Sequence, residues 1–242
     1  KTSAFFAKRD VAFSEAQMRT LHFIGSDDNY TNLALLLSDQ CVHTTKLAVF
    51  EGSEKTVFKD RKELTGSLLS QLEEAYEFID RYNRTRAEFS GLDRIDMRDY
   101  PTEAVREALL NAIVHREYSF SSSTLISIFD DRIEFVTIGG LVKGVLLEDI
   151  ELGVSILRNE HLANIFYQLM LIEAHGTGIA KIRRSYAGAA VQPQIEVTNN
   201  AFKITLPNMN CERSEGAMTS KKLSSSEKVV SKEDRATLVL EM

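Results

Sequence analysis

The sequence predicts an α+β fold, a two-layer sandwich in which helices pack on a mixed, mostly antiparallel sheet. Two observations lead to this prediction. Most strand-like segments come in neighbouring pairs joined by short turns, which is typical of antiparallel hairpins. The helical segments lie between these pairs and do not alternate with single strands, as they would in a βαβ fold.

Composition sets the broad class of the protein. The 242 residues, 43% of them hydrophobic and 26% charged, suffice for a globular chain with a sizeable core. A net charge of −6 argues against a protein built mainly to coat nucleic acid. No run of 18 apolar residues occurs, so we expect no membrane span. No secretory signal is evident, and Cys41 and Cys211 match no metal motif, so we expect a cytoplasmic location.

The first third of the chain contains two helical patterns and one strand pair. Residues 14–40 have the pattern of a helix, punctuated at Asn29 or Thr31, and two short strands follow at 46–52 and 56–60. Residues 62–83 carry the strongest helical pattern of the chain. Its apolar residues recur at helical spacing and should face the core: Leu64, Leu68, Leu69, Leu72, Ala75, Phe78 and Ile79.

The middle of the chain predicts strand–turn–strand, helix and hairpin. Residues 84–101 form the first unit and end on Pro101. A helix over 101–117 should follow, since proline suits the first turn and Glu103 suits the positive end of the helix dipole. Residues 124–129 and 133–138 flank Asp130-Asp131-Arg132 and predict a β-hairpin.

The last part predicts helices over 159–173 and 178–187, then a hairpin of residues 194–198 and 202–207. We therefore divide the chain into an N-terminal connecting module (1–60), a main domain (61–208) and a polar linker or disordered tail (209–242), which is rich in serine and lysine. Because the chain begins at Lys1 and not at Met, we expect it to be a fragment or a processed chain.

Glu107, Asn111 and His115 form a polar stripe on the helix predicted over 101–117. They follow one another at i, i+4 spacing and therefore share one face, while most other positions of the helix are apolar. Buried polar groups need partners, and leaving one unpaired costs roughly 1–3 kcal/mol. The stripe predicts either a satisfied core network, with Glu107 paired to an arginine such as Arg158, or a site for a ligand.

Two glycine-rich turns favour the ligand. Gly139-Gly140 follows a strand, and Gly176-Thr177-Gly178 opens a helix. Glycines let backbone amides approach a ligand closely, and a helix N-terminus attracts anions. The basic stretch that follows, Lys181-Ile182-Arg183-Arg184, is interpreted as a solvated helix face.

The order of these motifs resembles that of the GHKL ATPase superfamily, which includes gyrase, MutL and the histidine kinases and has the Bergerat fold. Glu107-x-x-x-Asn111 resembles its N-box, which implies that Glu107 is the catalytic residue acting on the attacking water and that Asn111 binds Mg. Gly176, Thr177 and Gly178 resemble the second glycine box, which contacts phosphates. The resemblance implies ATP and Mg as cofactors.

The segments 30–40, 100–119, 130–141 and 158–182 resemble one branch more closely, prokaryotic proteins described as transcriptional regulators or, after the RecG name, as ATP-dependent helicase-like. The resemblance covers roughly residues 28–208. Members of this branch usually carry a Schlafen AlbA-like domain before this region, and many end in a winged helix. The resemblance implies that DNA is bound through domains outside this chain. It does not decide whether the protein forms a homodimer.

The chain departs from the superfamily at the first glycine box, where an aspartate normally receives the adenine amino group. Thr137 stands at that position, ahead of Gly139 and Gly140, and all three are expected nucleotide-binding residues. No G-x-x-x-x-G-K-[ST] loop occurs, which argues against a P-loop motor. We expect a regulatory, nucleotide-sensing domain with a weak or degenerate ATP site. An active Mg-dependent ATPase and a structural dimerisation scaffold remain as alternatives.

Overall fold

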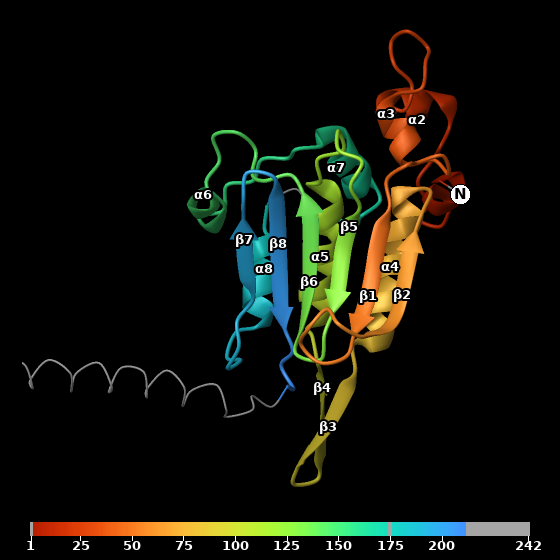
Figure 1. The fold of residues 1–242 in the computed structure, drawn as a ribbon. Helices are drawn as coiled ribbons and strands as arrows, with labels where there is room; N and C mark the ends of the chain where they lie inside the picture. The colour runs from red at the N-terminus through yellow and green to blue at the C-terminus, as the bar shows by residue number, and fades with distance from the viewer. Residues whose placement is uncertain (1, 174–175, 212–242) are drawn as a thin grey trace, which may run out of the picture. The chain divides into compact units, whose positions relative to one another are not determined.

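A six-stranded sheet forms one layer of the protein, seen in Figure 1 in the order β2-β1-β5-β6-β8-β7. The computed structural model describes residues 2–173 and 176–211. β1 and β5 run parallel, and the other neighbours are antiparallel, so the predicted mixed, mostly antiparallel sheet is confirmed. The strands are β1 (Thr45–Phe50), β2 (Phe58–Leu64), β5 (Thr124–Ile128), β6 (Arg132–Ile138), β7 (Gln194–Val197) and β8 (Ala201–Pro207).

Helices form the second layer, and Figure 1 shows α4, α5 and α8 side by side on one face of the sheet. Their bounds are Leu68–Tyr82, Thr102–Val114 and Gly178–Ser185. The remaining helices are α1 (Thr2–Ala7), α2 (Glu15–Thr20), α3 (Asn32–Leu36), α6 (Leu147–Glu151) and α7 (Glu160–Gln168). In the part of the chain that the structure describes, no helix has the length and apolar character needed to cross a bilayer.

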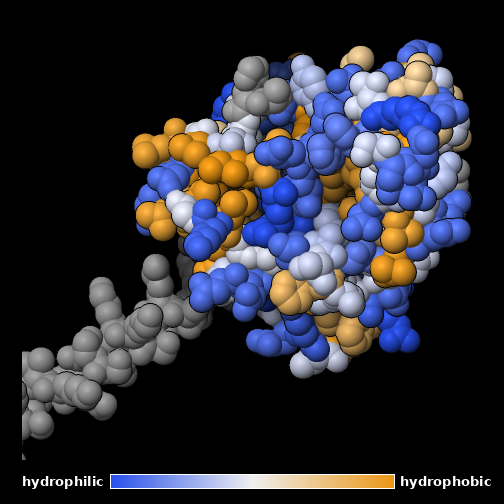
Figure 2. All heavy atoms as spheres, turned by 90° about the horizontal axis from the view of Figure 1, so that it is seen from above, coloured by the Kyte–Doolittle hydropathy of each residue, from blue (hydrophilic) through white to orange (hydrophobic). Residues whose placement is uncertain are grey.

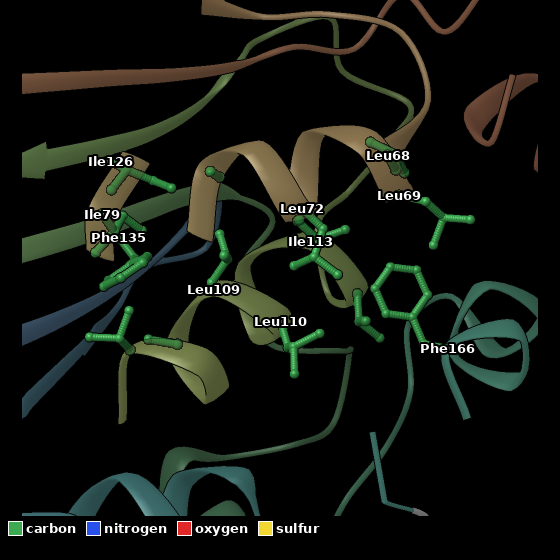
Figure 3. Close-up of a cluster of buried hydrophobic side chains, with 14 of the residues drawn as sticks. Leu68, Leu69, Leu72, Ile79, Leu109, Leu110, Ile113, Ile126, Phe135 and Phe166 are labelled. Carbon is green, nitrogen blue, oxygen red and sulfur yellow. The ribbon is translucent and has the colours of Figure 1, made fainter. Parts of the chain in front are cut away.

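The core lies between the two layers, with α5 at its centre (Figure 3). Leu109 and Ile113 of α5 are almost fully buried, next to Leu72 of α4 and Phe135 of β6. Burying a side chain of this size contributes about 1.5–3 kcal/mol. The apolar circumference of α5 thus fixes the helix in place, and its polar stripe is fixed with it.

Several element boundaries differ from the prediction; the helix expected over 159–173, for example, is α7 and ends at Gln168. The helix expected over 14–40 is broken near Asn29 and Thr31 as expected, but the break is longer: α2 ends at Thr20 and α3 begins at Asn32. In the turn between them Asp28 has φ +62°, and the Asn29 backbone amide donates to Asp27 Oδ1 at 3.2 Å. Thr31 caps α3 by accepting from the Ala34 amide. β2 extends to Leu64, and Gly66, at φ +78°, turns the chain before α4 begins at Leu68.

The boundary expected at residue 60 falls inside β2. β2 pairs with β1, and β1 pairs with β5 of the main domain, so the strands at 45–64 share one sheet with it. Accordingly, the chain up to Asn210 forms one compact unit. Of the predicted tail, residues 212–242 lie outside the described residues.

The strand–turn–strand unit is confirmed as a separate hairpin of β3 (Thr85–Ser90) and β4 (Asp93–Arg98). It is anchored at its base, where Asn83 and Tyr100 exchange two hydrogen bonds of 2.9 Å. Beyond this base the hairpin extends away from the sheet (Figure 1), and none of its strand residues is buried. The hairpin projects from the end of the sheet at which β6 begins.

Candidate nucleotide site between α5, α7 and α8

A cavity of about 410 Å³ opens where β6 ends. Figure 2 looks onto this end of the molecule and shows hydrophobic residues gathered beside strongly hydrophilic ones. The lining includes most of the predicted site residues: Glu107, Asn111, His115, Gly139, Gly140, Gly176, Thr177 and Gly178. The polar stripe and both glycine turns therefore meet in one cavity, whose volume is within the range of small-molecule sites, about 300–1,000 Å³.

Glu107 is the buried acid of this cavity, with a side chain that is 12% exposed. Burial raises the pKa of its carboxyl, although Arg106 and Lys181 lie close enough to oppose the rise. The alternative pairing with Arg158 does not occur, because Arg158 binds Glu117 at 2.7 Å. The Glu107 side chain is thus held by neighbouring cations and remains at the cavity surface.

Replacing Glu107 with glutamine is expected to raise the free energy of unfolding at pH 7. The folded protein binds this proton more tightly than the unfolded chain, whose pKa is about 4.5, so ionisation costs stability as the pH rises above that value. The difference between variant and wild type should shrink as the pH falls toward 4.5. Urea unfolding of both proteins between pH 7 and 4.5 measures this difference in the free energy of unfolding.

Glu103→Gln is the matched control, since Glu103 is an exposed acid of the same helix whose contact with Arg184 is 3.8 Å. Its effect should stay within about 0.5 kcal/mol. A Glu107→Gln variant less stable than wild type at pH 7 would contradict the raised pKa.

Asn111 and His115 continue the stripe along the cavity wall. Burial, with Arg158 nearby, lowers the pKa of His115 to about 4, so the imidazole is neutral at pH 7. Among the described residues no three His, Cys, Asp or Glu side chains cluster as a metal site. Mg²⁺ bound to nucleotides commonly takes only one or two protein ligands beside phosphate oxygens and water. The Asn111 amide oxygen, which lines the cavity, fits as one such ligand.

Three of the glycines are required by packing. A Cβ on Gly140 would lie 2.2 Å from the Thr198 carbonyl oxygen. A Cβ on Gly139 or Gly176 would meet Glu117 Cβ at 2.9 Å or Ser155 Cβ at 2.3 Å, and both glycines have positive φ. Gly178 differs, because a Cβ there would meet only Glu107 Oε2, at 3.2 Å. Gly178 is therefore the glycine whose missing side chain keeps the space beside Glu107 open.

Thr137 does not reach the cavity, which corrects its expected role as a nucleotide-binding residue. It is 2% exposed, and its hydroxyl donates to the Ala112 carbonyl at 3.2 Å. The Thr137 side chain on β6 therefore points toward α5, and its hydrogen bond links the sheet to this helix. The described cavity lining includes no aspartate; its carboxylates belong to Glu107, Glu160 and Glu173.

Lys181 is a cavity residue that the sequence interpretation missed. Its side chain is 14% exposed, and Ile182 is fully buried, so the expected solvated face is wrong for both. Arg183 and Arg184 do lie on the surface, paired with Glu151 and Glu103. The spacing from Gly178 could have indicated this position, because a lysine three residues after Gly178 lies in the first turn of α8, beside the glycine turn.

The residues that follow His115 have packing roles. Arg116 is 1% exposed and donates to the carbonyl oxygens of Thr44 and Ser122. The Tyr118 hydroxyl donates to the Ile113 carbonyl at 2.8 Å. Asn159 donates from its amide to the carbonyls of Val114 and Arg116, both at 2.8 Å, and so ties the start of α7 to the end of α5. These contacts fix the wall of the cavity.

Comparison with known proteins supports an ATPase-like domain. Residues 122–206 match a family described as "Putative ATP-dependent DNA helicase recG C-terminal". This stretch includes both glycine turns and Lys181. Glu107 and Asn111 precede it in the sequence. No curated protein matches the chain.

A solved structure has a similar fold. The DIP2311 protein from Corynebacterium diphtheriae superimposes with a TM-score of 0.72 at 20% sequence identity. The superposition covers 86% of this chain and 43% of that chain, so the chain spans less than half the length of this relative.

Proposed function

We propose that the cavity binds a magnesium–nucleotide complex, ATP or ADP, and that the chain is the nucleotide-sensing regulatory domain of a DNA-binding transcriptional regulator. The observation that carries the proposal is that Glu107, Asn111 and the Gly178 turn line one cavity. The match of residues 122–206 to an ATPase-like family supports it. DNA would be bound through parts of the protein outside this chain.

The chemistry of the lining fits such a ligand. Part of the wall is apolar and suits a base: Leu141, Val142, Val145, Ile150, Val154 and Ile172. The N-terminus of α8, with Lys181 in its first turn, suits phosphates. The open position of Gly178 leaves space beside Glu107 for a ligand group.

Binding is expected to be weak. With Thr137 turned toward α5, the adenine amino group lacks the carboxylate that receives it in the GHKL ATPases which this chain resembles. A missing hydrogen bond of this kind costs about 1–3 kcal/mol, or roughly five- to 150-fold in affinity. A weak site would respond to changes in nucleotide concentration in the cell, which suits a sensor.

Hydrolysis is the second candidate, and the buried Glu107 favours it. Desolvation raises the pKa of this carboxyl, which makes the carboxylate a better general base toward water. A bound Mg²⁺ would neutralise phosphate charge. Arg106 and Lys181 would hold the Glu107 side chain in place, and Asn111 would supply the metal with an amide oxygen.

A thermal-shift titration with Mg-ATP and Mg-ADP tests the proposal. A ligand at 100 times its dissociation constant adds about 2.7 kcal/mol of stability, so the unfolding temperature should rise with nucleotide concentration. Asn111→Ala should abolish the magnesium-dependent part of the shift. If the protein hydrolyses ATP, Glu107→Ala should stop phosphate release.

Asn32→Ala is the control, because Asn32 is exposed on α3 and does not line this cavity. It should leave the shift unchanged. A wild-type protein whose unfolding temperature does not respond to millimolar Mg-ATP or Mg-ADP would overturn the proposal. A shift that Asn111→Ala leaves intact would overturn the assigned site.

A further inference from the structure

Lys181 lies between two carboxylates in the cavity. Its Nζ is 2.7 Å from Glu173 Oε1 and 3.9 Å from Glu107 Oε1. Within the described lining it is the one lysine, and its side chain is 14% exposed. An ammonium group in this position is largely shielded from water, so its interactions with anions are stronger than those of a surface lysine.

The helix directs Lys181 toward the N-terminus of α8, where phosphates are proposed to bind. Side chains of an α-helix tilt toward the helix N-terminus, so Lys181 points back along the first turn toward Thr177 and Gly178. The Lys181 amide donates to the Thr177 carbonyl at 2.8 Å, which fixes this turn. The ammonium group and the first amides of α8 therefore converge beside Glu107, where an anion would meet both.

The two acids beside Lys181 differ in exposure. Glu107 is 12% exposed and belongs to the buried helix α5, whereas Glu173 is 61% exposed and lies in the segment before the glycine turn. Glu173 accepts from Lys181 and, at 3.4 Å, from the Thr177 hydroxyl. The hydrogen bond with Lys181 lowers the pKa of Glu173, so the carboxylate is ionised at pH 7. The exposed Glu173 carboxylate thus occupies two hydrogen-bond donors, Lys181 and Thr177, that would also suit a phosphate.

We propose that Lys181 binds the terminal phosphate of a nucleoside triphosphate and that Glu173 is an internal anion that competes with this phosphate for Lys181. Triphosphate binding then exchanges one anion for another at the ammonium group, and Glu173 moves into solvent. The competition makes Lys181 selective for ligands that carry more negative charge than a single carboxylate. This inference rests on the proposed nucleotide site and adds how that site distinguishes a triphosphate from a diphosphate.

Calorimetric titration of the full chain with Mg-ATP and Mg-ADP tests the proposal. Lys181→Met should weaken ATP binding about tenfold or more, as expected for the loss of a charge-assisted hydrogen bond, and change ADP binding less than about threefold. Glu173→Gln should tighten ATP binding several-fold, because it removes the competing charge. The two single variants therefore have opposite expected signs.

Two further variants complete the design. Arg183→Met is the matched control, because Arg183 is the next basic residue of α8 and is half exposed, paired with Glu151. It should bind both nucleotides as wild type does. The double variant Lys181→Met/Glu173→Gln should bind ATP no more tightly than Lys181→Met alone, since Glu173 competes only through Lys181. Circular-dichroism melts establish that each variant is folded.

Several results would overturn the inference. Equal loss of ATP and ADP binding in Lys181→Met would mean that Lys181 does not select the terminal phosphate. Weaker ATP binding in Glu173→Gln would mean that Glu173 supports the ligand and does not compete with it. A wild-type chain that binds neither nucleotide would instead overturn the proposed function itself, and this inference with it.

Discussion

Gly140→Ala is expected to destabilise the protein by about 1–3 kcal/mol or more, the cost of overpacking a filled interior. The added methyl group would lie 2.2 Å from the Thr198 carbonyl oxygen and 2.7 Å from that of Asn199. Both atoms belong to the backbone between β7 and β8, so no side chain can rotate away. The β7–β8 turn would have to move, and Gly139, whose amide donates to the Asn200 carbonyl at 2.9 Å, would be disturbed with it. Urea unfolding measures the loss.

Gly178→Ala is the matched variant and should behave in the opposite way. The new methyl group would meet only Glu107 Oε2, at 3.2 Å, and a side-chain oxygen can shift by a few tenths of an ångström. Alanine also favours the first turn of a helix over glycine. Stability should therefore be kept while nucleotide binding is lost. Equal stability loss in the two variants would show that both glycines serve packing alone.

Acidification from pH 6.5 to 4 is expected to cost up to about 3 kcal/mol of stability through His115, because a shift of one pKa unit corresponds to about 1.36 kcal/mol. The imidazole has a pKa of about 4 in the folded protein and about 6.5 when unfolded. The unfolded chain therefore takes up the proton first. The stability contributed by the neutral ring is complete above pH 6.5 and is lost as the pH falls through this window. His115→Gln should remove this part of the pH dependence.

The measurement compares the slope of unfolding free energy against pH in both proteins, because carboxyl groups also titrate near the lower end of the window. His161→Gln is the control, since His161 is exposed on α7. It should keep the wild-type slope. If His115→Gln keeps that slope as well, the ring is more accessible to water than its position in the cavity wall indicates.

Elements with strong local patterns were predicted well. The apolar face of α4, the β5–β6 hairpin and the polar stripe of α5 all follow from spacings within a few residues. The boundary between β2 and α4 was not predictable in this way. Leu64 fits the helical spacing of the following residues, yet it pairs with Thr45 in the sheet and is buried there. Tertiary pairing decided the conformation at that position.

Which residues of the candidate site meet in one cavity was largely predictable, but their individual contacts were not. The sequence placed Gly140 and Gly178 together as ligand-contacting glycines, but only the fold shows that Gly140 faces the backbone of a distant turn. Thr137 was expected to bind nucleotide because it stands where related proteins have an aspartate. In the structure its hydroxyl donates instead to the Ala112 carbonyl of α5. Lys181 was missed because the carboxylates that hold it lie on other segments. Each correction depends on contacts between residues far apart in the chain.

The tip of the β3–β4 hairpin is a suitable attachment site for a probe or a tether. Its tip at Gly91 has φ +64° and open space around it, and Leu92 is fully exposed. In Figure 1 this tip lies at the opposite end of the sheet from the glycine turn after β6. A cysteine-linked fluorophore or a surface tether placed at Leu92 would therefore leave the cavity unobstructed, so that occupancy could be followed on immobilised single molecules.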